Sequence, residues 1–193
     1  MPSLNIEYLE KFRELESRGG EDAIMEMLKA RRPLCRQYSF AIPTIEAVEA
    51  LISISPLVEI GAGTGYWTML VSQSGGDITA YDKKPSKGNK YAFTHTHTEV
   101  FQGDESVLSS IDKRFSLFLC WPNYDNDFAY NCLRRFKGNT LAYAGEARGG
   151  CTANDKFFEL LEVEWTLSKH VSLPQWFGIN DSLFLYDRKT IIE

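Results

Sequence analysis

Apolar residues recur at two different spacings along the chain, and the change of spacing separates helices from strands. Near the N-terminus an apolar residue returns every three positions among charged neighbours, at Ile6, Leu9, Phe12 and Leu15. This spacing predicts an amphipathic helix that ends at the two glycines of positions 19 and 20. A second helix is expected to begin at the acids of positions 21 and 22 and to end near the Arg-Arg-Pro of positions 31–33.

The rest of the chain is a series of short apolar runs separated by helical patterns. The runs that we expect to form strands are 57–60, 77–82, 99–101, 115–120, 140–144, 163–167 and 183–185. Strands that alternate with helical segments are typical of βαβ units, so the pattern predicts an α/β fold around a mostly parallel sheet. The last two runs follow one another without a helix between them, which predicts an antiparallel pair at the end of the chain.

Residues 57–82 carry the most informative motif. An apolar run with an acid, Glu59, leads into Gly61-Ala62-Gly63-Thr64-Gly65, and a second run ends in Asp82 about twenty residues after the first glycine. A dinucleotide fingerprint, G-x-G-x-x-G, would need its third glycine at position 66, which is Tyr66. A carboxylate at position 59 suits an ammonium group and is unsuited to a pyrophosphate, whereas Asp82 is placed to accept both hydroxyls of a ribose.

This pattern resembles the first motif of the class I, Rossmann-like, S-adenosylmethionine-dependent methyltransferases. The resemblance implies a three-layer αβα sandwich with a seven-stranded Rossmann-like sheet and an antiparallel C-terminal strand. It also implies S-adenosylmethionine as the cofactor. The cofactor-binding residues would then be Glu59, Gly61, Ala62, Gly63, Gly65, Asp82, Gly103, Asp104, Cys120 and Trp121. Asp104 is equally well placed to cap the helix that follows it.

The segment after the fourth strand, Trp121-Pro122-Asn123-Tyr124, resembles the fourth motif of the amino-methylating branch, which reads Asp or Asn, Pro, Pro, Tyr or Phe. Trp121 stands where that branch has a polar acceptor, and an indole can only donate a hydrogen bond. The usual methylation of an adenine or glutamine nitrogen is therefore disfavoured. Tyr124 and Glu146 are the candidate catalytic residues, with Glu146 orienting a substrate or accepting its proton. Pairing with Arg148, or solvation, is the plain structural alternative for Glu146.

Composition restricts the partners. With 21 Lys and Arg against 26 Asp and Glu, the formal net charge is −5, which favours a small-molecule or protein acceptor over a polynucleotide. The 4 cysteines show no C-x-x-C pairing, and His95 and His97 lack further ligands, so we expect reduced thiols and no metal. The chain has no apolar run of about 20 residues and no basic-then-apolar N-terminus, which predicts a cytoplasmic protein without membrane contact.

We expect an N-terminal helical extension, residues 1–37, followed by a single Rossmann-like domain over residues 38–193. Methyl transfer to a small-molecule or protein acceptor is the predicted function. A protein carboxylate is one open possibility for the acceptor, because Gly63-Thr64-Gly65-Tyr66 also resembles the turn of protein isoaspartate methyltransferases. The chain could instead be a non-catalytic module that keeps the fold for cofactor binding or interaction, or a dinucleotide oxidoreductase, against which Tyr66 argues. Trp176 and Phe177 lie in a loop where they cover a substrate or fold back onto the core.

Overall fold

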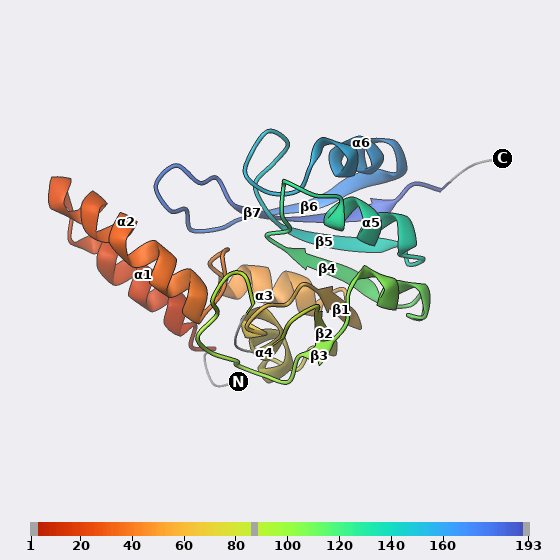
Figure 1. Ribbon diagram of the computed structural model, residues 1–193, viewed down its shortest axis with the longest axis horizontal. Helices are drawn as coiled ribbons and strands as arrows, with labels where there is room; N and C mark the ends of the chain where they lie inside the picture. The colour runs from red at the N-terminus through yellow and green to blue at the C-terminus, as the bar shows by residue number, and fades with distance from the viewer. Residues whose placement is uncertain (1–3, 86–88, 191–193) are drawn as a thin grey trace.

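The computed structural model describes residues 4–85 and 89–190, and its seven strands form one sheet in the order β3-β2-β1-β4-β5-β7-β6 (Figure 1). The strands are β1 (Leu57–Ile60), β2 (Ile78–Asp82), β3 (Phe101–Gln102), β4 (Ser116–Cys120), β5 (Thr140–Gly145), β6 (Trp165–Ser172) and β7 (Ser182–Arg188). Strands β1 to β5 pair in parallel, and β7 runs antiparallel to both β5 and β6. The predicted mostly parallel sheet with an antiparallel C-terminal strand is confirmed.

Helices cover both faces of this sheet. They are α1 (Glu7–Ser17), α2 (Gly20–Gln37), α3 (Ile45–Ile52), α4 (Tyr66–Gln73), the 3₁₀ helix η1 (Glu105–Ser109), α5 (Phe128–Arg135) and α6 (Asp155–Glu164). Successive strand residues enter opposite cores because side chains alternate along a strand. In β4, Phe118 joins the cluster under α1, α3 and α4, whereas Leu117 and Leu119 join the cluster under α5 and α6. The expected αβα sandwich follows from this alternation.

The N-terminal helices form a hairpin that extends away from the sheet (Figure 1). The buried residues Tyr8, Leu9 and Phe12 attach α1 to the core, as the three-residue spacing predicts. The predicted end of α2 near residue 33 is wrong, since Pro33 lies inside a helix that continues to Gln37. A proline removes one backbone hydrogen bond, and burial of Cys35 and Tyr38 against α1 offsets that loss.

Strand β6 begins two residues later than the sequence suggests. Helix α6 extends to Glu164, so Val163 lies on the helix and is 71% exposed. Strand β6 is at the edge of the sheet, where Trp165 is buried but Leu167 is 50% exposed. Val163 therefore belongs to α6, although its alternation with Trp165 and Leu167 alone predicts a strand.

Candidate cofactor-binding site

The glycine turn joins β1 to α4 at the carboxyl edge of the sheet. Gly61, Gly63 and Gly65 have φ angles of +79°, +58° and +71°, a region that residues with a Cβ rarely adopt. The backbone N–H groups of Gly61 and Ala62 donate to the carbonyl oxygen of Tyr81, at 2.8 and 3.0 Å, which ties the turn to β2. A side chain at position 61 would place its Cβ only 3.1 Å from the Phe128 ring.

Asp82 ends β2 directly beside this turn. Its Oδ2 accepts a hydrogen bond from the N–H of Gly63 at 3.0 Å, and its Oδ1 accepts one from the N–H of Lys84 at 2.7 Å. A carboxylate offers about four acceptor positions, so two remain for a ligand. The geometry holds Asp82 at the position where the sequence predicts a ribose contact.

A cavity of about 520 Å³ opens at this edge of the sheet, and we call it the strand-end cavity. Its polar lining carries both signs of charge, with carboxylates at Asp82, Asp104, Glu105 and Asp127 and amines at Lys83, Lys84 and Lys90. Its other walls are Phe40, Ile60, Gly61, Asn89, Tyr91, Phe93, Gly103, Cys120, Trp121, Pro122, Asn123, Asn126, Phe128 and Asn131. Six of the ten predicted cofactor-binding residues therefore line one cavity: Gly61, Asp82, Gly103, Asp104, Cys120 and Trp121.

Gly103 and Asp104 form the turn after β3. The N–H of Gly103 donates to the carbonyl oxygen of Asp82 at 3.0 Å, and a Cβ at position 103 would lie 2.9 Å from the Tyr81 ring. Asp104 is the N-cap of η1, where its Oδ1 accepts hydrogen bonds from the N–H and hydroxyl of Ser106 at 3.0 and 2.7 Å. These hydrogen bonds lower the pKa of Asp104, so the carboxylate is charged at neutral pH.

Aromatic rings form a further part of the lining of the strand-end cavity, which we call its aromatic end. Phe40 stacks on Trp121 with ring centroids 5.1 Å apart, and its ring also meets Tyr91 and Phe93 edge-on. Trp121 has a φ of +51°, which is strained for a bulky residue, and its Nε1 donates to Oδ1 of Asp181 at 2.8 Å. The lining of the cavity therefore combines polar residues, among them Asp82 and Asp104, with the aromatic end at Phe40 and Trp121.

Glu59 does not line the strand-end cavity. It is 2% exposed on β1, and its Oε2 accepts a hydrogen bond from the hydroxyl of Thr68 on α4. Burial, with a smaller contribution from the charge of Asp82, raises the pKa of Glu59 from 4.5 to about 8. The structure thus places a largely protonated acid inside the core at the position that we expected to meet an ammonium group.

Gly63 and Gly65 are covered by the segment that connects β2 to β3. A Cβ at Gly63 would lie 2.9 Å from the ring of Phe93. A Cβ at Gly65 would lie 2.9 Å from methyl groups of Thr98 and Val100. The N–H of His97 donates to the carbonyl oxygen of Thr64 at 2.9 Å. Ala62, Gly63 and Gly65 are accordingly absent from the lining of the cavity.

The segment that covers the glycine turn also carries the two neighbouring histidines, His95 and His97. The ring nitrogen Nε2 of His97 is hydrogen-bonded to the carbonyl oxygen of Gln37 at 2.7 Å, and the ring stacks on Tyr38. Across residues 4–85 and 89–190, no group of three or more His, Cys, Asp or Glu side chains is arranged to hold a metal ion.

The candidate catalytic residues lie outside the strand-end cavity. Tyr124 is 62% exposed. Glu146 is 5% exposed, and its two carboxylate oxygens accept hydrogen bonds from the N–H groups of Cys151 at 2.7 Å and Asn180 at 2.9 Å. Glu146 therefore links the loop after β5 to the loop before β7, and its role in proton transfer stays a prediction.

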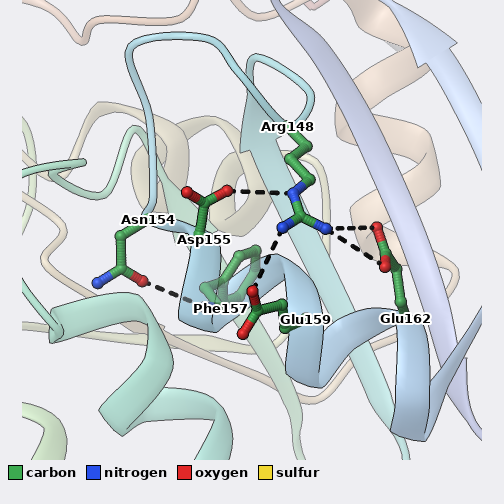
Figure 2. Close-up of polar contacts among 6 residues, drawn as sticks. All are labelled: Arg148, Asn154, Asp155, Phe157, Glu159 and Glu162. Atoms are coloured by element: carbon green, nitrogen blue, oxygen red, sulfur yellow. Dashed lines mark hydrogen bonds and ion pairs between the residues drawn. The ribbon is translucent and has the colours of Figure 1, made fainter.

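Arg148 is not the partner of Glu146. Figure 2 shows its guanidinium among three carboxylates of α6, at 3.1 Å from Asp155, 3.4 Å from Glu159 and 3.3 Å from Glu162. The carboxylates of these pairs are all more than half exposed, so the network ties the loop to α6 with little net stabilisation.

Several lining residues carry no signal in the sequence patterns described above. Phe128 begins α5 and reaches the cavity because its helix starts at the same edge of the sheet as the glycine turn. A search for apolar residues at the first turn after each strand would have found it. Tyr91 and Phe93 belong to an irregular segment without a periodic signal, so their positions required the structure. Trp176, by contrast, folds back, and its Nε1 donates to the hydroxyl of Tyr8 at 3.1 Å.

Comparison with solved structures identifies the fold. Over 96% of its length the chain superimposes on 93% of magnesium protoporphyrin IX methyltransferase from Synechocystis PCC 6803, determined with bound S-adenosylmethionine, at a TM-score of 0.55 and 9% identity. The chain has the class I methyltransferase fold. The Streptococcus pneumoniae protein Sp1610, provisionally a tRNA (m1A22) methyltransferase, matches at a TM-score of 0.50 and 12% identity, over 78% of this chain and 76% of the other.

At the level of sequence alone the comparisons find nothing similar. No family model matches the chain, and no curated protein does. The methyltransferase fold here therefore rests on the arrangement of the elements. In the described part of the chain, none of the helices combines the length and apolar character needed to cross a membrane.

Proposed function

We propose that this chain is an S-adenosylmethionine-dependent methyltransferase that acts on a small molecule or a protein side chain. The observation that carries the proposal is the meeting of Gly61, Asp82, Gly103 and Asp104 around one cavity at the carboxyl edge of the sheet. Open α/β sheets bind ligands at this edge. Solved proteins with the same fold have been crystallised with S-adenosylmethionine, which supports the cofactor assignment.

The lining of the strand-end cavity fits the proposed cofactor. The free acceptor positions of Asp82 suit the two ribose hydroxyls, and the Gly103–Asp104 turn with Phe128 provides a polar and an apolar contact for adenine. The aromatic end, which also includes Tyr91 and Phe93, suits the sulfonium, because aromatic rings attract cations. When bound, the cofactor supplies an already activated methyl group, so the chain chiefly has to orient the acceptor and exclude water.

The acceptor is expected to approach through the aromatic end of the cavity. The indole N–H of Trp121 donates to Asp181, and the indole offers no hydrogen-bond acceptor there. This arrangement disfavours the usual recognition of an amine by the fourth motif. Asn123, whose Oδ1 accepts a hydrogen bond from the Tyr91 hydroxyl, is the polar side chain nearest in sequence to Trp121 that lines the cavity.

A non-catalytic, cofactor-binding module is the second candidate, and one observation favours it. The two candidate catalytic side chains, Tyr124 and Glu146, lie outside the cavity, and Glu146 already accepts two backbone hydrogen bonds. In such a module, S-adenosylmethionine would bind and no acceptor would be methylated.

Asp82→Ala tests the proposal most simply. We expect the loss of the ribose contacts, at about 1.5–3 kcal/mol for hydrogen bonds to a charged group, to weaken S-adenosylmethionine binding at least tenfold. Calorimetric titration measures the affinity, and the thermal midpoint shows that the variant is folded. Asp125→Ala, which changes an exposed acid outside the cavity, is the matched control. Equal affinities for the folded Asp82 variant, the control and the wild type would refute the ribose assignment.

A further inference from the structure

Trp121 connects the strand-end cavity to charged residues that do not line it. Its ring lies against Phe40 inside the cavity, whereas its Nε1 donates to Oδ1 of Asp181, which is outside the cavity lining. The guanidinium carbon of Arg31, on α2, lies 5.5 Å from the centre of the same ring. Contacts from residues 31–40 and from Asp181, far apart in the sequence, thus meet at one indole.

Asp181 is held in an unusual state for a carboxylate. It is 1% exposed, and its Oδ2 is buried without a hydrogen-bond partner among residues 4–85 and 89–190. The Nε of Arg31 is likewise buried and unpartnered within the same residues, and Arg31 forms no ion pair with Asp181 there. Leaving buried polar atoms unpaired is unfavourable, so stability alone does not account for an acid at this position.

The conformation of Trp121 explains why an acid lies at position 181. A positive φ is unfavourable in a bulky residue and persists only where the surroundings impose it. The backbone N–H of Trp121 donates to the carbonyl oxygen of Ala144 at 2.8 Å, which fixes the main chain. The hydrogen bond from the indole N–H to Asp181 fixes the side chain of Trp121. Without this hydrogen bond the indole N–H would be free to donate to another acceptor, including one in the cavity.

We propose that Asp181 is a positioning residue for cofactor binding: it holds Trp121 so that the indole ring, with Phe40, forms the aromatic wall of the strand-end cavity. The proposal rests on the proposed function. Asp181 does not line the cavity, and its hydrogen bond from the Trp121 indole is the contact that connects it to the lining.

The charge of Asp181 is set by its surroundings. Burial, and then the negative charge of Glu146, raise its pKa to about 7, whereas the Trp121 hydrogen bond and Arg31 lower it. The other titratable groups influenced by its charge are the thiols of Cys35, Cys120 and Cys151 and the phenol of Tyr143, and burial raises the pKa of each. Asp181 therefore gains its charge as pH rises from about 6 to about 8, and its hydrogen bond from Trp121 strengthens.

The test combines a spectroscopic titration with a double-mutant cycle. The chain has 4 tryptophans, so Trp121→Phe identifies the indole N–H signal of Trp121 in ¹H–¹⁵N spectra by its loss. We expect that signal to shift with a midpoint near pH 7 in the wild type and to stay constant in Asp181→Asn. Asp187→Asn, an exposed acid on the neighbouring strand β7, should titrate like the wild type.

Calorimetry at about pH 8 then links the contact to the cofactor. Asp181→Asn should weaken S-adenosylmethionine binding roughly tenfold and should have no further effect in a Trp121→Phe background. The proposal would be overturned if Asp181→Asn reduced the affinity equally in the wild-type and Trp121→Phe backgrounds. It would also be overturned if the indole signal of Trp121 changed neither with pH nor with the Asp181 substitution. For the pH titration, Trp121→Phe serves only to assign the signal, and the titration itself is made on the wild type. It needs no cofactor, so a wild type that binds no S-adenosylmethionine would remove the proposed function and the role of Asp181 in cofactor binding together, while the titration separately decides the Asp181–Trp121 contact.

Discussion

Glu59→Gln should change how the stability of the protein depends on pH. In the folded chain the buried carboxyl keeps its proton up to a pKa of about 8, against 4.5 for the free group. Between those values the folded state binds one more proton than the unfolded state, so the free energy of unfolding falls as pH rises. The slope is about 1.4 kcal/mol per pH unit, which gives about 3 kcal/mol between about pH 5 and about pH 7.5 for this one group.

Urea unfolding of the wild type and the variant at about pH 5, 6 and 7.5 measures this effect. The glutamine does not titrate, so the variant should gain about 3 kcal/mol relative to the wild type across the range. Asp181, whose pKa is also raised, contributes the same slope to both proteins and cancels in the difference. A difference in unfolding free energy that stays constant with pH would show that Glu59 is ionised in the folded state and would refute this account of its burial.

Two further substitutions probe the turn and the loops. Gly61→Ala places a methyl group 3.1 Å from the Phe128 ring at a positive φ. We therefore expect a loss of about 1–2 kcal/mol in stability and at least tenfold weaker S-adenosylmethionine binding. An unchanged melting temperature and an unchanged affinity in calorimetric titration would contradict the turn geometry. Glu146→Gln removes one acceptor between two loops and should cost about 1–3 kcal/mol in urea unfolding, with cofactor affinity unchanged. A stability equal to that of the wild type would show that Glu146 does not link the loops, and reduced turnover with an identified acceptor would support its catalytic role.

The cofactor edge of the fold is predictable from the sequence because its signals are local. Three glycines at fixed spacing impose positive φ angles, and an acid at the end of the next strand, Asp82, lies beside them in any βαβ unit. The same logic places Asp104 at the third strand and as a helix cap. These predictions require only chain order and the parallel pairing of β1, β2 and β3.

The remaining parts of the site depend on contacts between distant segments. Asp181 and Trp121 are separated by 60 positions, and nothing in either local pattern indicates their hydrogen bond. Phe93 reaches Gly63 through an irregular connection whose path no periodicity predicts. Glu59 differs from expectation for a related reason, since the motif gives its position on β1 but not the direction of its side chain, which points to Thr68.

Calorimetric titration of the wild-type protein with S-adenosylmethionine, S-adenosylhomocysteine and NAD in parallel tests the central claim most directly. The account predicts saturable binding of the first two, at one site per chain, and no binding of NAD. Binding of NAD alone would mean that Tyr66 does not exclude a dinucleotide from the glycine turn. Binding of none of the three would contradict the assignment of the strand-end cavity to a methyl-donor cofactor.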